Sequence, residues 1–264
     1  MTLDLEIIAH RGFSAVAPEN TLSAMERALE AGADAVEFDL HVARCSTPVL
    51  FHDDTLDRTT RGTGLLQEHT FDELRQMDAG GWFAPAFSGE PVPSLEQALA
   101  CLKGRVGRVY AEVKAWREMG DIDRIVRIVQ DADLAYDTVF IAMDWQALDR
   151  IASLDDETSI GYIVEHPERW SQALHRAARS RRALLDIDHR LVLANPDWVA
   201  EAAAQGVETA VWTCDDPDEA ERLADLGVRR FTTNQVDRLL VWRADRAQRN
   251  GRAGASDAPA GDQT

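Results

Sequence analysis

Long hydrophobic runs are absent from this sequence of 264 residues. No stretch approaches the roughly 18 to 20 apolar residues that a helix needs to cross a bilayer, so we expect no transmembrane segment. The first residues lack the basic region and the apolar core of a signal peptide, which favours a cytoplasmic protein. Cysteine is also scarce: its three copies have no metal-like spacing, which indicates reduced thiols rather than a disulfide framework.

Basic residues are few relative to acidic ones. The 28 lysines and arginines face 46 aspartates and glutamates, which gives a formal net charge of −18. Nucleic acids and anionic membrane surfaces attract basic patches, so this balance argues against both as partners. A small substrate that carries phosphate stays compatible with it, because a metal ion and one or two local cations can invert the field inside a pocket.

Strand-like and helix-like segments alternate along nearly the whole sequence. Apolar runs such as 109–113, 138–142 and 160–164 are each followed by apolar residues at helical spacing. About eight such pairs predict a parallel sheet with helical crossovers. That number favours closure into a (β/α)8 TIM barrel, an α/β fold that reaches this length as a single domain.

Several residues mark the expected helix starts. Asn20 or Thr21 can cap the first helix, and Ser94 begins the pattern of a capping box. Asn195 and Asp216 each precede a proline, which is typical of a cap followed by the first helical residue.

The alternation stops between His52 and Ser94. An insert of this length between two barrel elements is typical of a functional segment. We therefore expect residues 53–93, approximately, to form a small cap after the second strand, over one mouth of the barrel. The barrel domain is expected to cover residues 1–249, and residues 250–264, which lack periodicity, to be a disordered tail.

Two carboxylates stand on an otherwise apolar strand. Glu37 and Asp39 are two residues apart, and alternate residues of a strand share a face, so both side chains are expected to point the same way. Buried carboxylates are costly when unpaired, and such a pair suits a hard divalent cation. His41 shares this face, and both a ligand role and a supporting role stay open for it.

Other polar residues follow other predicted strands. The active site of a TIM barrel lies at the carboxyl ends of its strands, so we expect these groups to converge there. They are His10 and Arg11 after the first strand, His52 before the insert, Glu112 and Lys114 at the end of the third strand, His189 after the sixth and Trp212 at the end of the seventh. Trp212 is expected to form a wall of the substrate site, and His189 is a weaker candidate.

A set of short motifs then identifies a family. They are His10-Arg11-Gly12, Pro18-Glu19-Asn20-Thr21, Glu37-x-Asp39, His52-Asp53, Leu56-x-Arg58-Thr59-Thr60, Glu112-x-Lys114 and Val211-Trp212-Thr213. With these motifs in this order, the chain resembles the glycerophosphodiester phosphodiesterase (GDPD) family from residue 7 to about residue 240.

The resemblance implies metal-dependent hydrolysis of glycerophosphodiesters, such as glycerophosphocholine and glycerophosphoethanolamine, to sn-glycerol 3-phosphate and an alcohol. It implies that Glu37, Asp39 and Glu112 hold a divalent cation, commonly Mg²⁺ or Ca²⁺. It implies that His10 and His52 form a general acid–base pair, and that Arg11 and Lys114 contact the phosphate. Which histidine is the acid stays open, as do the alcohol head group, initial attack by the glycerol 2-hydroxyl through a cyclic intermediate, and the oligomeric state.

The chain departs from the family pattern near its end. Cys214-Asp215 stands where the family tends toward Val-Asn, and Asn234 stands where an aspartate is expected. We expect these changes to affect the alcohol specificity more than the chemistry. Two alternatives remain: a lysophospholipase D, which an apolar channel under the cap would favour, and a non-catalytic phosphate-binding protein, against which the intact histidine pair argues.

Overall fold

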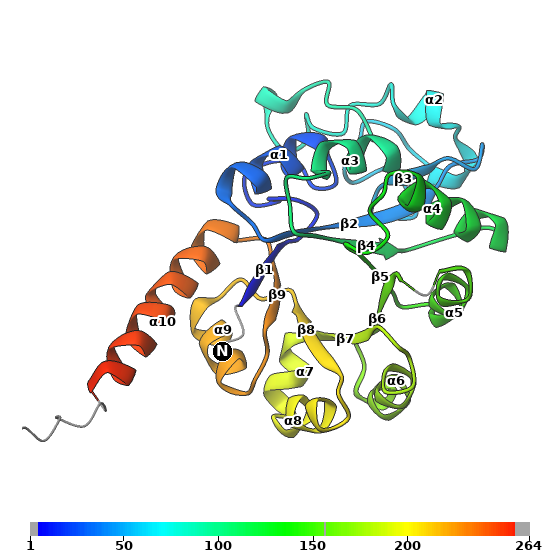
Figure 1. Cartoon of the computed structure of the whole chain (residues 1–264). Helices are drawn as coiled ribbons and strands as arrows, with labels where there is room; N and C mark the ends of the chain where they lie inside the picture. Colours follow the sequence, from blue (N-terminus) through cyan, green and yellow to red (C-terminus); the bar gives the residue numbers. More distant parts are fainter. Residues whose placement is uncertain (1–4, 156, 257–264) are drawn as a thin grey trace, which may run out of the picture.

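The computed structural model describes residues 5–155 and 157–256. Eight parallel strands form a ring that closes because the first strand pairs with both the second and the last (Figure 1). They are β1 (Glu6–Ala9), β2 (Ala35–Val42), β4 (Arg108–Val113), β5 (Thr138–Ala142), β6 (Ser159–Val164), β7 (Ala183–Asp188), β8 (Glu208–Trp212) and β9 (Arg230–Thr233). The expected TIM barrel is confirmed.

Helices surround this ring on its outer side (Figure 1). They are α1 (Leu22–Ala31), α3 (Leu95–Leu102), α4 (Met119–Asp131), α5 (Trp145–Leu154), α6 (Trp170–Ala177) preceded by the 3-10 turn η3 (Pro167–Arg169), α7 (His189–Ala194), α8 (Asp197–Ala204), α9 (Pro217–Asp225) and α10 (Val236–Ser256). The sequence did not predict α7, because six residues are too few to show a helical period.

Most helix starts follow the expected capping chemistry. The Thr21 side chain accepts a hydrogen bond from the main chain of α1, and Ser94 forms the expected capping box at α3. Asp216 caps α9. The prediction for Asn195 is wrong: its side-chain amide donates to the Leu191 carbonyl at the end of α7 instead of capping α8.

Side chains that alternate along the strands divide between an outer and an inner core. Outward-facing residues such as Val36 and Phe38 pack with the helices. The inward-facing cluster consists of Ile8, Ala35, Tyr110, Val139, Ile141, Ile163, Leu184 and Ala210. At the amino ends of the strands the Tyr110 hydroxyl donates to Glu6 over 2.9 Å, and Arg230 forms an ion pair with the same carboxylate. A polar network therefore lies across that end of the barrel.

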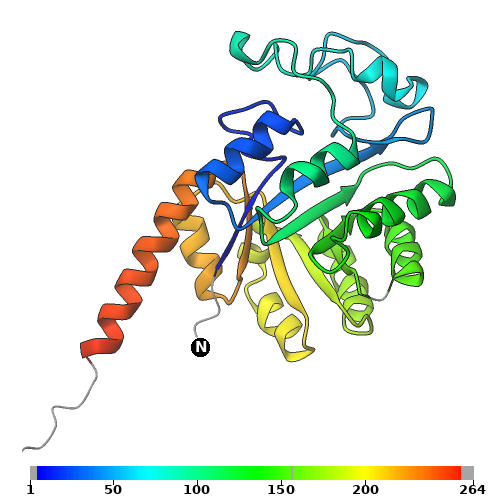
Figure 2. The same ribbon diagram turned by 45° about the horizontal axis from the view of Figure 1, so that its top comes forward.

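The insert after the second barrel strand folds on a small core of its own. It follows β3 (Pro48–Leu50), which runs antiparallel to β2 outside the ring, and contains η1 (Leu66–Glu68), α2 (Phe71–Leu74) and η2 (Pro85–Phe87). Its buried residues include Leu56, Leu66 and Leu74. The insert projects beyond the carboxyl end of β2 (Figure 2).

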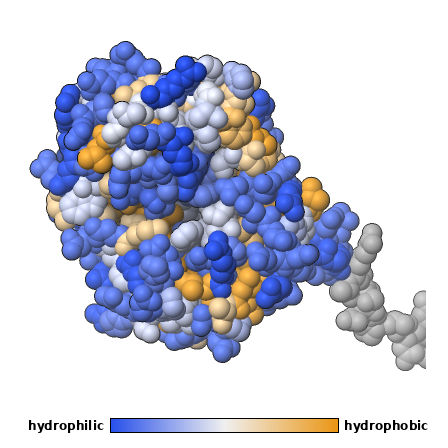
Figure 3. Space-filling model, turned by 180° about the vertical axis from the view of Figure 1, so that it is seen from behind, coloured by the Kyte–Doolittle hydropathy of each residue, from blue (hydrophilic) through white to orange (hydrophobic). Residues whose placement is uncertain are grey.

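The last helix is longer than the sequence indicated. The tail was expected to be disordered from residue 250, but α10 continues to Ser256, and residues 257–264 lie outside the described part of the chain. No helix within residues 5–155 and 157–256 has the length and apolar character needed to span a membrane. The face seen from behind is mainly hydrophilic, with smaller hydrophobic patches (Figure 3). All three cysteines are free.

Candidate active site

A cavity with an empty volume of about 480 Å³ lies inside the barrel ring. Its lining includes seven of the eight residues predicted from the sequence, namely His10, Arg11, Glu37, His52, Glu112, Lys114 and Trp212. The eighth, Asp39, is fully buried beside it. The structure therefore brings together groups from the ends of four barrel strands, β1, β2, β4 and β8, with His52 from just before the insert, as the strand-end argument predicts.

Three carboxylates form the centre of the site. Glu37, Asp39 and Glu112 each place one oxygen within 4.8 Å of the others, because Asp39 and Glu112 are direct partners in the pairing of β2 with β4. The Asn20 amide donates to Oδ2 of Asp39 over 2.7 Å, whereas Oδ1 of Asp39 has no hydrogen-bond partner among the described residues. This fixed carboxylate with a free buried oxygen fits a metal ligand.

The protonation of these carboxyl groups reflects their crowding. Burial and the nearby Asp39 raise the pKa of Glu37 well above its ordinary value, and the same two causes raise the pKa of Glu112 to about 8. Burial also disfavours the ionised form of Asp39, but the positive charges of Arg11, His52 and Lys114 outweigh it and hold its pKa below the usual range. A divalent cation can replace the protons that such a cluster otherwise retains.

Two cationic side chains lie beside the carboxylates. The Lys114 ammonium is 2.9 Å from Glu112 and 4.0 Å from Asp39. The Arg11 guanidinium is 3.1 Å from Asp39 and 2.7 Å from Glu19. Both are enclosed by acidic groups on one side and line the cavity on the other, where a phosphate can bind them.

The turn that delivers Arg11 depends on the glycine that follows it. Arg11 and Gly12 have positive φ angles of 56° and 79°, and the Arg11 amide donates to Glu37 over 2.8 Å. A Cβ atom on Gly12 would lie 2.6 Å from the main-chain carbonyl carbon of Ala24. The tight turn therefore places the first strand end directly on α1.

We expect Gly12→Ala to lower the free energy of unfolding by about 3 kcal/mol, because it combines a left-handed backbone with a collision. Gly64→Ala is the matched control, since Gly64 has a φ of 88° but no atom within 4 Å of the added Cβ, and its expected cost is about 1 kcal/mol. Urea titrations of both variants measure the difference. Equal losses would show that the contact with Ala24 carries no penalty.

The first histidine is oriented by an amide. The Asn234 side chain donates to Oδ2 of Asp215 over 2.8 Å, which directs its Oδ1 toward Nδ1 of His10 at 2.7 Å. Nδ1 therefore carries a proton, and Nε2, 4.0 Å from Glu37, is left as the acceptor. Burial and the neighbouring Arg11 lower the pKa of His10 to about 4.

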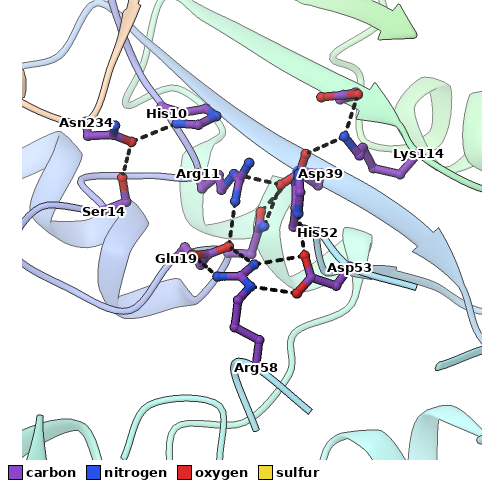
Figure 4. A network of polar contacts seen from close by, with 12 residues as sticks. His10, Arg11, Ser14, Glu19, Asp39, His52, Asp53, Arg58, Lys114 and Asn234 are labelled. Carbon is purple, nitrogen blue, oxygen red and sulfur yellow. Dashed lines mark hydrogen bonds and ion pairs between the residues drawn. The ribbon is translucent and has the colours of Figure 1, made fainter. Parts of the chain in front are cut away.

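The second histidine is paired with a carboxylate. Nδ1 of His52 lies 2.6 Å from Asp53, so it donates to this aspartate. Arg58 donates to Asp53 from Nε and Nη2 and to Glu19 from Nη1 and Nη2, so that Nη2 contacts both carboxylates (Figure 4). Its hydrogen bonds are the main cause that lowers the pKa of Asp53 to about 2. With Arg11 bound to Glu19, one continuous network joins the insert to the barrel.

The remaining histidine candidates lie outside the cavity lining. His41 donates from Nε2 to the His52 carbonyl over 3.1 Å, which supports the position of that residue. His189 lies between the Trp212 carbonyl and Glu219. Neither histidine belongs to the carboxylate cluster.

Some functional candidates were missed or left open by the sequence. Asn20 was a possible helix cap, but it holds Asp39. Asp186 lines the cavity from β7, and its position two residues after Leu184 on an apolar strand is the same signal that identified Glu37. Asp215 and Asn234, which depart from the family pattern, contact each other and reach His10, so they lie at the predicted acid–base pair.

Comparison with known sequences agrees with this geometry. The family model described as the glycerophosphoryl diester phosphodiesterase family matches residues 10–238. A glycerophosphodiester phosphodiesterase from Caldanaerobacter subterraneus subsp. tengcongensis is 28% identical over 238 residues, which cover 89% of this chain and 96% of that relative.

Solved structures give the same result. A glycerophosphodiester phosphodiesterase from Agrobacterium tumefaciens str. C58 has a TM-score of 0.77 at 28% identity, over 91% of this chain and 99% of that one. An Oleispira antarctica phosphodiesterase in complex with the product sn-glycerol-3-phosphate has a TM-score of 0.79 at 27% identity, over 90% of this chain and 96% of that one. The family match spans most of the sequence and confirms the expected class of enzyme. The chain belongs to the glycerophosphoryl diester phosphodiesterase family.

Proposed function

We propose that this protein hydrolyses glycerophosphodiesters to sn-glycerol 3-phosphate and an alcohol. The observation that carries the proposal is the convergence, in one cavity, of a carboxylate cluster, two cations and two histidines with different partners. The family match and the product-bound Oleispira antarctica structure support it.

Glu37, Asp39 and Glu112 would hold a divalent cation, most suitably Mg²⁺ or Ca²⁺ because all three donors are oxygens. The chemistry that such an ion supplies is neutralisation of the charge on the phosphate oxygens. Arg11 and Lys114 bind the same phosphate, the first through a planar fork and the second as a point charge.

The partners of the two histidines support different roles for them. Asn234 keeps the proton of His10 on Nδ1, so Nε2 takes a proton from the attacking hydroxyl. His52 donates a proton to the oxygen of the departing alcohol, and the adjacent Asp53 carboxylate compensates the charge of the protonated ring.

The leaving group tests the role of His52. We expect His52→Ala to lower the rate on glycerophosphocholine by about 10²- to 10⁴-fold, because choline leaves as an alcohol that needs a proton. With a 4-nitrophenyl ester of glycerol 3-phosphate the expected loss is below about tenfold, since nitrophenolate leaves without one. Release of glycerol 3-phosphate and of nitrophenol measures the two rates.

His175→Gln, on the exposed face of α6, is the matched control. Equal losses on both esters would contradict the acid role of His52.

The same assays, run with EDTA and then after addition of Mg²⁺ or Ca²⁺, test the metal. We expect EDTA to abolish both reactions, and hydrolysis that survives chelation would remove the metal from the proposal.

A further inference from the structure

A fourth carboxyl group lines the cavity on the side opposite to the insert. Asp186 lies on β7, which is across the closed ring of eight strands from β2. Its side chain is only 3% exposed, and Oδ1 has no hydrogen-bond partner among the described residues. A buried polar atom without a partner costs free energy, which indicates a group that an incoming ligand satisfies.

The surroundings of Asp186 differ from those of the carboxylate cluster. The nearby cavity wall consists of Ile141, Met143, Ile163 and the indole of Trp212, whose ring nitrogen donates to the Asp186 carbonyl over 3.3 Å. This wall carries no lysine or arginine, so it offers nothing to a phosphate. Burial raises the pKa of Asp186 to about 7. Near neutral pH its carboxyl group can therefore donate a hydrogen bond as well as accept one, as a hydroxyl ligand requires.

We propose that Asp186 determines specificity by hydrogen bonding a free hydroxyl of the glycerol arm of the substrate. The inference rests on the proposed function, which places the phosphate at Arg11, Lys114 and the carboxylate cluster. It extends that function by naming the residue that would distinguish a free glycerol hydroxyl from an acylated one.

The position of the proton donor selects the glycerol arm rather than the alcohol arm. His52 follows β3, which pairs with β2, and its partners Asp53 and Arg58 belong to the insert. The alcohol that His52 protonates therefore departs on that side. The arm that stays on the phosphate extends across the ring toward Asp186 and Trp212, where a glycerol has apolar carbons for the wall and hydroxyls for the carboxyl group.

An acylated glycerol lacks the hydroxyl that this carboxyl group binds. A site that hydrogen bonds a substrate hydroxyl discriminates strongly against an analogue without it, because the buried partner is left unpaired. The proposal therefore favours deacylated diesters as substrates. Lysolipids, which the sequence had left open as an alternative, are disfavoured.

Binding measurements separate this inference from the catalytic proposal. With Mg²⁺ present, we expect wild type to bind sn-glycerol 3-phosphate about 10- to 100-fold more tightly than propyl phosphate, which lacks the hydroxyls. Asp186→Ala is expected to lose this preference and to bind inorganic phosphate within about twofold of wild type. Asp186→Asn, which keeps both hydrogen-bonding functions, is expected to lose less than about fivefold. Titration calorimetry measures the affinity of each protein for all three ligands.

Asp188→Asn is the matched control, because Asp188 lies on the same strand and caps α7 outside the cavity. Equal affinity of wild type for the two organic phosphates would overturn the inference without use of any variant. If Asp186→Ala also loses affinity for inorganic phosphate to the same extent, the inference is overturned, since the residue would then act on the phosphate. If wild type binds glycerol 3-phosphate selectively, Asp186→Ala loses this selectivity and no diester is hydrolysed, the proposed function fails while the contact between Asp186 and the glycerol hydroxyl is retained.

Kinetics provide a second readout. We expect wild type to hydrolyse glycerophosphocholine at least about 100-fold more efficiently than 1-acyl-lysophosphatidylcholine. Asp186→Ala is expected to lower kcat/KM for glycerophosphocholine by about 10- to 100-fold and to change that for bis(4-nitrophenyl) phosphate by less than about threefold. Equal hydrolysis of both lipids by wild type, or equal losses on both substrates, would reject the role of Asp186.

Discussion

Replacement of Glu37 by glutamine is expected to lower the rate of glycerophosphodiester hydrolysis by about 10³-fold or more, while it stabilises the metal-free protein. The loss of rate follows from the loss of one of three ligands. The gain of stability follows from the repulsion between Glu37, Asp39 and Glu112, which raises the pKa of Glu37 together with burial. Glutamine keeps the shape and the acceptor for the Arg11 amide but removes the charge.

The raised pKa values also predict the direction in which the stability of the metal-free protein changes with pH. Burial and Asp39 raise the pKa of Glu112 to about 8. A carboxyl group with a higher pKa in the folded state binds its proton more tightly there, so its contribution is full below the unfolded pKa and is lost as the pH rises through the folded one. In EDTA, we therefore expect the free energy of unfolding to fall between about pH 5 and pH 8.

Urea titrations at several pH values, with EDTA or with Mg²⁺, measure both effects. Glu37→Gln is expected to flatten the pH dependence in EDTA and to lose the stabilisation that Mg²⁺ gives to wild type. Glu30→Gln, in an exposed ion pair with Arg27, is the matched control. A Glu37→Gln protein that is less stable than wild type in EDTA, or that retains a tenth of the activity, would contradict the metal role.

Removal of the imidazole at position 10 is expected to lower the rate by about 10²- to 10⁴-fold on every diester. Unlike His52→Ala, His10→Ala is not rescued by a nitrophenyl leaving group, because the base acts on the attacking hydroxyl. We expect the affinity for inorganic phosphate to stay within about threefold of wild type, since Arg11 and Lys114 remain. Rescue by the better leaving group would show that His10 acts as the acid.

Asn234 offers a finer test of the same assignment. Asn234→Ala frees the ring of His10, and a loss of about 10- to 100-fold is typical of groups that orient a functional histidine. Asn234→Asp places a carboxylate beside Nδ1, which raises the pKa of His10. The acidic limb of the kcat/KM profile is then expected to move to higher pH, because the base must be unprotonated. An unchanged acidic limb would show that another group titrates there.

The barrel and most of its chemistry could be predicted from local patterns. Apolar runs with helical segments between them determine the parallel ring, and the rule that alternate strand residues share a face brought Glu37 and Asp39 together. The same rule pairs Asp186 with Asp188, but Asp188 ends the strand and caps α7, so the strand pattern did not identify Asp186 as a site residue.

What the sequence could not show depends on contacts between distant loops. The bond between His10 and Asn234 joins residues 224 positions apart, and neither side chain indicates the other. The hydrogen bonds that connect Glu19 to Asp53 through the Arg58 side chain likewise depend on how the insert packs against the barrel. These contacts are the basis of the different roles proposed for the two histidines, which motifs alone left equivalent.

The polar network of Glu6, Tyr110 and Arg230 has a consequence for turnover. Because it obstructs the amino-terminal end, ligands enter and leave the cavity at the carboxyl end. If the proposed function holds, we expect the alcohol, released beside the insert, to depart first and the glycerol phosphate beneath it to leave last. The final product would then occupy the form of the enzyme that the next substrate requires, so we expect glycerol 3-phosphate to inhibit competitively.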